Sequence, residues 1–284
     1  MGATRTRQAP EAPDPAAVFR PHRRWYRRPG VVVPVALVVI GYALLAGAVQ
    51  EPGSYAPEVY PDGDLRFDWN FFVYLVPMML TGLLVTAKAT LWGFAAALVL
   101  GFLLALGRRS RRAWVRWPVT AGIEFVRSTP LLVQLFFWQA SVRAVDWIAL
   151  QPLEILTLGL GIHYATYCSE AYRAGINSVP AGQWEAATSL SLGPVTTWTR
   201  VIIPQAVPNV LPALGNYLVA AFKDAPMGFI VNVHGLLFFA NSIRDTAFRP
   251  VEPYLLAGLG FLLVSIPAAW AVRLLEKRIS YERI

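Results

Sequence analysis

The sequence holds few charges, a single cysteine and three histidines. Only 15% of its 284 residues are charged, against about 25% in typical soluble domains. The one cysteine, Cys168, can form no intrachain disulfide. The histidines His22, His163 and His234 lack the spacing of a zinc site. These shortages exclude an intrachain disulfide and argue against an ordinary soluble domain and against a metal centre.

Motifs of nucleotide hydrolysis and of metalloprotease chemistry are also missing. There is no G-x-x-x-x-G-K-[ST] loop, so the chain does not bind ATP through a P-loop, and there is no H-E-x-x-H. No nucleophile, base and metal set converges, which disfavours a membrane enzyme. We predict no catalytic residue and no cofactor in this chain. The formal charge of +8 does not indicate nucleic-acid binding, because the basic residues gather in a few loops and in the N-terminal tail.

Long apolar runs are what the sequence has in abundance, and 56% of its residues are hydrophobic. We predict six membrane spans, at residues 31–49, 83–106, 123–142, 152–176, 210–233 and 254–275. Five arginines directly follow the second run: Arg108, Arg109, Arg111, Arg112 and Arg116. They place this loop in the cytoplasm, since cytoplasmic loops are enriched in basic residues. Six spans then put both termini in the cytoplasm.

The N-terminal quarter divides into three predicted parts. Residues 1–30 form a disordered, basic cytoplasmic tail. Residues 31–50 form an extra N-terminal transmembrane helix; a cleaved signal peptide is the alternative, because Ala46-Gly47-Ala48 resembles a cleavage site. Residues 51–74, which are acidic, form an extracytoplasmic loop, and residues 71–81 are expected to form a short interfacial helix.

One polar segment, GQWEAATSLSLGPVTTWTRVIIPQA, separates the fourth and fifth spans. Its first helical run covers residues 183–190 and places Trp184, Ala187 and Leu190 on one face. Gly193-Pro194 breaks this run, and a second run ends at Pro204. A short helical hairpin on the cytoplasmic side suits docking into a groove of a partner. An ordinary re-entry loop is the alternative.

This segment, residues 180–206, resembles the EAA loop of importer-type ABC transporter permeases. The matching residues are Glu185, Ala186, Ala187, Val201, Ile203 and Pro204. The glycine of the family pattern falls at Ser191, and Gly193 follows as a substitute at the turn. A serine there costs about 1 kcal/mol if the left-handed backbone is kept. The resemblance implies that the loop seats on a separate ATP-hydrolysing subunit.

Further stretches resemble the polar amino acid branch of these permeases, which serves histidine, glutamine, arginine and opines. They are E-F-V-R-S-T-P-L-L-V-Q from Glu124, E-A-Y-R-A-G-I from Glu170 and L-P-A-L-G-N from Leu211. K-D-A-P-M from Lys223 departs from the K-D-T-S-L of that branch. It is closer to a variant in permeases for ectoine and hydroxyectoine, which are zwitterionic compatible solutes. The resemblance covers about residues 75–276.

The resemblance implies an all-α integral membrane protein with about six transmembrane helices and the type I ABC importer permease fold. Residues 75–276 would form its transmembrane domain, with cytoplasmic EAA coupling helices, and residues 277–284 a cytoplasmic tail. The implied function is import of a polar amino acid or compatible solute across the bacterial cytoplasmic membrane. The implied partners are an ATPase dimer holding ATP and Mg, a second permease subunit, identical or different, and an extracytoplasmic solute-binding protein. A secondary transporter or channel is the alternative, although neither inverted repeats nor a ring of charges is clear.

Polar side chains inside the spans are candidates for the solute pathway or its gate, because burying a charge in a bilayer costs about 2.5–3.5 kcal/mol. The candidates are Lys223, Asp224, Gln134, Thr129, Glu124, Arg127, Glu170 and Arg173. Two pairs among them, Glu124–Arg127 and Glu170–Arg173, have the spacing that closes on one helix face. Structural and solute-contacting roles both remain open. Thr129-Pro130 is expected to kink or start a helix, and His163 to be a buried hydrogen-bonding residue.

Overall fold

The computed structural model describes residues 67–144 and 149–281. The predicted basic tail, the first span and most of the acidic loop lie outside the described residues. The helices are α3 (Trp69–Arg108), α4 (Ala113–Ser128), α5 (Leu131–Ala144), α6 (Pro152–Asn177), α7 (Ala181–Ser189), α8 (Pro194–Thr196), α9 (Ile203–Asp224), α10 (Leu236–Ala247) and α11 (Val251–Tyr281). A π-helical stretch, η2 (Thr197–Ile202), leads into α9, and a 3₁₀ helix, η3 (Ala225–Val231), follows it. Short connections join these helices, and the described part of the chain contains no strand.

Helix α3 is continuous for 40 residues, from Trp69 to Arg108. It begins at Trp69 because the Asp68 side chain accepts hydrogen bonds from the amides of Asn70 and Phe71, at 2.8 and 3.1 Å. The separate interfacial helix predicted at residues 71–81 is therefore wrong, and the loop boundary predicted at residue 74 falls inside α3. Apolar side chains of this first part pack with α10 and α11, which holds the helix together past Pro77.

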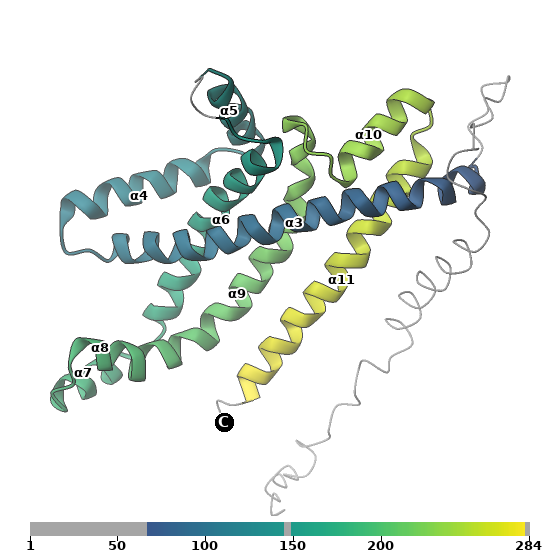
Figure 1. The fold of residues 1–284 in the computed structure, drawn as a ribbon. Helices are drawn as coiled ribbons and strands as arrows, with labels where there is room; N and C mark the ends of the chain where they lie inside the picture. The colour runs from purple at the N-terminus through teal and green to yellow at the C-terminus, as the bar shows by residue number, and fades with distance from the viewer. Residues whose placement is uncertain (1–66, 145–148, 282–284) are drawn as a thin grey trace, which may run out of the picture. The chain divides into compact units, whose positions relative to one another are not determined.

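Helix α6 lies at the centre of the bundle and packs against α3, α5 and α9. Figure 1 shows α3 running across α6, α9 and α11. Glycines allow α3 and α6 to approach closely: a Cβ on Gly101 would lie 2.6 Å from the Cβ of Cys168. Cys168 is fully buried, so its predicted role as a small packing residue is confirmed. The bounds of α6 agree with the span predicted at 152–176.

Two predicted spans are broken. The span predicted at 123–142 is split, because α4 ends at Ser128 and α5 begins at Leu131; the interruption at Thr129-Pro130 is confirmed. In the fifth predicted span, α9 gives way after Asp224 to the 3₁₀ helix η3, which has Pro226 in its first turn. The prediction that a helix ends at Pro204 is wrong. This proline stands at the start of α9, where the missing N–H costs little.

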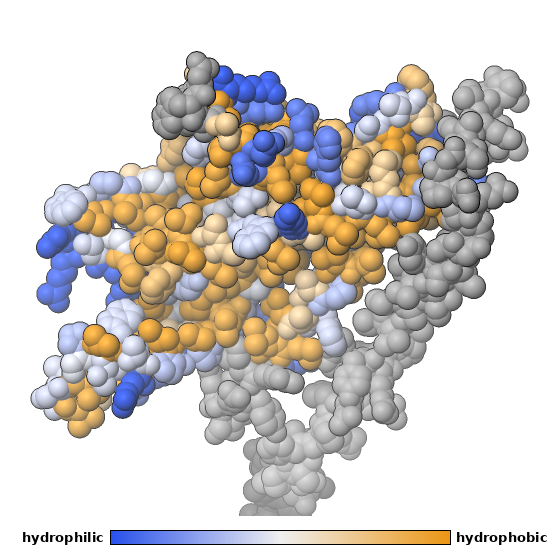
Figure 2. Space-filling view, viewed as in Figure 1, coloured by the Kyte–Doolittle hydropathy of each residue, from blue (hydrophilic) through white to orange (hydrophobic). Residues whose placement is uncertain are grey.

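Two described helical segments are long and apolar enough to cross a membrane, Trp69–Arg108 and Val251–Lys277. A third span results if Pro194–Val231 and Leu236–Ala247, which are bent by 47°, count as one. Helix α6 is long enough, but Glu154, His163 and Glu170 lower its mean hydropathy. Figure 2 shows hydrophobic side chains over most of the visible face and hydrophilic ones mainly at its edges.

Candidate functional site

The polar segment after α6 folds back on itself around an indole pair. Helix α7 and the stretch η2 are joined by Trp184 and Trp198, whose rings meet edge to face at 5.4 Å. Beneath the two indoles lies a small buried core of Ile176, Val179, Ile202 and Ala206. The segment is therefore a packed helical hairpin, and Figure 1 shows α7 and α8 together at one end of the structure.

The residues of the EAA pattern divide into outward- and inward-facing ones. Glu185 and Ala186 are exposed, whereas Ala187 is buried. Ile203 and Pro204 are also exposed. Leu190, predicted to lie on one face with Trp184 and Ala187, is the C-cap residue of α7 and is 72% exposed. The hairpin thus presents a carboxylate beside uncovered apolar side chains, a combination that suits a protein-docking surface.

The turn after α7 is made by Ser191 rather than by Gly193. Ser191 has φ 52°, in the left-handed region, whereas Gly193 has φ −62°. The amide of Leu192 donates to the carbonyl of Ala187 at 3.0 Å, and the amide of Ser191 to that of Thr188 at 2.9 Å. These two bonds form a Schellman motif, in which glycine is the usual left-handed residue. The serine therefore keeps the backbone geometry that the glycine of the family pattern would supply.

A cluster of charged side chains joins α3, α4 and α6, with Glu170 at its centre. Glu170 pairs with Arg173 at 2.7 Å, with Arg127 at 3.6 Å, and closely with Arg108. Glu124 lies 3.8 Å from Arg108. The predicted Glu170–Arg173 pair is therefore present. The predicted pair between Glu124 and Arg127 is not among the ion pairs of the described residues, because both side chains contact groups on other helices.

Gln134 bridges the break between α4 and α5. Its amide nitrogen donates to the carbonyls of Val126 and Thr129, at 2.8 and 3.0 Å, and lies 3.1 Å from the Thr129 hydroxyl. Its side-chain oxygen lies 3.2 Å from Nδ1 of His163. Because the amide oxygen can only accept, this contact places a proton on Nδ1. Gln134 therefore caps the end of α4 and fixes the orientation of a buried histidine on α6.

Two tyrosines of α6 contact charged side chains of neighbouring helices. The Tyr164 hydroxyl donates to the Asp224 carboxylate at 2.6 Å. The ring of Tyr167 lies 5.8 Å from that of Tyr164, and the Arg127 guanidinium stands 5.3 Å from the Tyr167 centroid. Lys223, although adjacent to Asp224, is exposed. The structure thus brings Asp224, Gln134 and Arg127 to one face of α6, which we call the α6 polar face, and leaves Lys223 outside it.

Three contributors were missed by sequence reasoning. Arg108 was interpreted as one of several loop arginines, and Tyr164 and Tyr167 were not among the candidate pathway residues. The signal for Arg108 was its place directly at the end of an apolar run, ahead of the loop proper. For Tyr164 and Tyr167 the signal was their spacing with Glu170, which puts all three on one side of α6.

The hairpin is connected to the bundle by polar contacts at the end of α6. Arg109 donates to the side-chain oxygen of Asn177 at 2.8 Å, and its guanidinium stands 5.9 Å from the Trp198 ring. Asn209 of α9 donates to the Ser178 hydroxyl at 2.5 Å. A displacement of the hairpin would therefore act on the ends of α3, α6 and α9 together.

Comparison with known proteins decides the family. The family described as binding-protein-dependent transport system inner membrane component matches residues 97–281. The chain belongs to this family. Among the relatives of this inner membrane component is a probable amino-acid ABC transporter permease, y4tG of Sinorhizobium fredii. It is 43% identical over 206 residues, 72% of this chain and 89% of the relative. The octopine transport system permease OccM of Rhizobium meliloti is 32% identical, and the match covers 78% of this chain and 91% of the length of OccM.

A solved structure agrees with this membership. The crystal structure of an amino acid ABC transporter with histidines has a TM-score of 0.70 and 29% identity, and the match covers 75% of this chain and 99% of that one. The recognition of an importer-type ABC permease of the polar amino acid group is therefore confirmed. So is the fold class, an all-α integral membrane protein with the type I importer permease fold.

Proposed function

We propose that this inner membrane component is a permease subunit of an ATP-driven importer for a polar amino acid or another small zwitterionic solute. The names of the relatives, which include amino-acid and octopine permeases, support an amino-acid-like solute. A narrower proposal is ectoine or hydroxyectoine. It rests on the K-D-A-P-M variant that begins at Lys223.

The observation that carries the proposal is the α6 polar face, which holds groups of both charge signs within an apolar bundle. A carboxylate, Asp224, stands at one end beside Tyr164, and a guanidinium, Arg127, stands at the other beside Tyr167. Charged groups inside membrane spans usually mark a solute pathway or pair with one another. A zwitterion carries an ammonium and a carboxylate, so it can bind to both ends of this face.

The proposed mechanism links this face to the hairpin around Glu185. A binding protein delivers solute from the extracytoplasmic side, and an ATPase dimer holds ATP and Mg on the cytoplasmic side. ATPase closure would move the hairpin and, through Asn177 and Ser178, the end of α6. The Glu170 cluster, which joins α3 and α4 to α6, would rearrange during this movement. A second permease subunit would complete the pathway, and both termini of the chain would lie in the cytoplasm.

Uptake by cells carrying the intact transport system tests this function. Cells with and without this chain would be given labelled polar amino acids, ectoine and hydroxyectoine. We expect uptake of one zwitterion class to require the chain, to stop when ATP is depleted and to survive dissipation of the proton gradient. Uptake that followed the ion gradient and ignored ATP depletion would instead identify a secondary transporter.

Calorimetry on the cognate binding protein separates the narrower proposals. Binding of ectoine with no response to amino acids would support a compatible-solute importer. Binding of an amino acid without ectoine would contradict the ectoine assignment and reduce K-D-A-P-M to a packing variant.

A further inference from the structure

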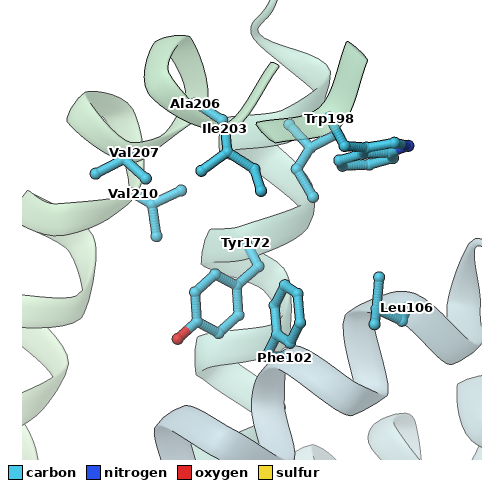
Figure 3. A pocket seen from close by; sticks show the side chains of 9 residues that line it. Phe102, Leu106, Tyr172, Trp198, Ile203, Ala206, Val207 and Val210 are labelled. Atoms are coloured by element: carbon cyan, nitrogen blue, oxygen red, sulfur yellow. The ribbon is translucent and has the colours of Figure 1, made fainter. Parts of the chain in front are cut away.

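An apolar groove of about 400 Å³ lies between the end of α3, α6 and the start of α9. Its walls are formed by Phe102, Leu106, Tyr172, Ile176, Trp198, Ile203, Ala206, Val207 and Val210. Figure 3 shows Phe102 and Leu106 facing Tyr172, with Val207 and Val210 across the groove. The Tyr172 hydroxyl is engaged, because it donates to the carbonyl of Leu98 at 3.3 Å. The groove therefore offers almost no polar contact, and a zwitterionic solute would lose its hydration there without compensation.

The groove is open to the exterior of the described chain. Phe102, Leu106, Ile203 and Val207 are each 40–43% exposed, although they line it. An apolar channel open to a membrane is filled by lipid tails, since water gains no hydrogen bonds in it. Its depth also suits a lipid, because Leu106 belongs to the last turn of α3, directly before the basic loop.

One cationic side chain, Arg109, stands at the end of the groove. The guanidinium of Arg109 lies over Trp198, one of the lining residues, at 5.9 Å from the ring centroid. Arg109 uses one donor on Asn177, at 2.8 Å, and an arginine carries five N–H donors. Arg111, Arg112 and Arg116 follow it and are exposed. An apolar channel that ends at a stacked arginine is complementary to an anionic phospholipid, which has an apolar chain below a phosphate.

We propose that this groove binds an anionic phospholipid of the cytoplasmic leaflet, with an acyl chain along Phe102 and Val207 and the phosphate at Arg109. The lipid contacts α3, α6, η2 and α9, the same elements that carry the coupling hairpin. The bound lipid therefore stabilises the position of the hairpin. Transport should then depend on the headgroup charge of the membrane. It goes beyond the transport function and does not depend on which solute is carried.

Fluorescence quenching of Trp198 tests the site in the complete transporter reconstituted into nanodiscs. The probes are phosphatidylglycerol and phosphatidylcholine with the same dibrominated acyl chains, each added at low mole fraction to unlabelled phosphatidylcholine. Bromine quenches indoles only at short range, and the difference between wild type and Trp198→Phe isolates this tryptophan. We expect the phosphatidylglycerol probe to quench Trp198 at lower mole fraction than the phosphatidylcholine probe. Added salt should weaken this preference.

Three variants sharpen the result. Arg109→Gln should raise the mole fraction needed for half-quenching about fivefold, the effect of one basic side chain at an anionic surface. Arg111→Gln removes the same charge two residues away and should leave quenching unchanged. Val207→Phe fills the groove and should abolish quenching by either probe. Equal quenching by both probes, no quenching at all, or equal effects of the two arginine variants would overturn the proposal.

Discussion

The hairpin between α6 and α9 and the α6 polar face differ in the sequence distance of the contacts that build them. In the hairpin, Trp184 meets Trp198, and the turn at Ser191 bonds to residues within the same helix end. On α6, Asp224 reaches Tyr164 across 60 residues, and Glu170 pairs with Arg108 across 62. A local structure leaves its pattern in consecutive residues, whereas a site assembled from several helices does not. A local structure such as this hairpin is therefore easier to find in a sequence than a cluster assembled from several helices.

The largest expected effect tests whether the hairpin is the surface that couples the permease to its ATPase. Glu185→Lys reverses an exposed charge that forms no ion pair among the described residues, so folding should be unaffected. We expect uptake to fall more than about a hundredfold, since reversing a charge at the centre of an interface can cost several kcal/mol. Uptake and the amount of protein in the membrane would be measured together.

Glu276→Lys is the matched control, because it makes the same charge change at the end of α11. It should transport normally. If Glu185→Lys took up solute at the wild-type rate, the hairpin would not couple the permease to its ATPase, although its sequence matches the EAA pattern.

The second effect concerns Asp224 on the α6 polar face. Asp224→Asn keeps the shape of the side chain but removes the charge, and we expect uptake to fall about tenfold, equivalent to the loss of about 1.4 kcal/mol of solute binding. Lys223→Gln, next in sequence but exposed, should change uptake less than twofold. Labelled solute uptake at several concentrations would show whether the half-saturating concentration rises. Equal effects of both substitutions would contradict the separation of these neighbours that the structure shows.

The third effect is on stability. Glu170→Gln leaves Arg108, Arg127 and Arg173 without their shared carboxylate, and we expect the free energy of unfolding to drop by about 1–3 kcal/mol. Glu124→Gln removes a carboxylate that is 57% exposed and 3.8 Å from its partner, so it should cost less than about 0.5 kcal/mol. Thermal unfolding of the purified protein in detergent compares the two. If both variants unfolded at the same temperature as the wild type, the Glu170 cluster would contribute nothing to stability.

The features that could be predicted from the sequence are likewise the local ones, and the features that were missed depend on contacts between distant residues. The bounds of α6 and the interruption at Thr129-Pro130 were predicted, the interruption because a proline acts on the backbone where it stands. The continuity of α3 was not, because a cap at Asp68 and packing against α10 and α11 outweigh Pro77. Among the candidate pathway residues, the Glu170–Arg173 pair follows from its i, i+3 spacing. The contacts that bring Asp224, Gln134 and Arg127 to α6 are known only from the structure. The roles of all of them remain predictions.

The smallest effect returns to the hairpin and its turn. Ser191 holds a left-handed backbone angle that costs a serine about 1 kcal/mol relative to glycine. Ser191→Gly should therefore raise the free energy of unfolding, but by less than about 1 kcal/mol, because glycine also gains entropy in the unfolded chain.

Gly193→Ala supplies the control. Gly193 has an ordinary extended backbone, and a Cβ added to it would meet no atom of the described residues within 4 Å, so alanine fits without strain. It should leave stability unchanged or raise it slightly. Thermal unfolding of the two variants would show which residue carries the turn. If Gly193→Ala destabilised the protein and Ser191→Gly did not stabilise it, the left-handed residue of the turn would be Gly193 in the membrane. The position of a turn could then not be read from the residue pattern, even where all its contacts are local.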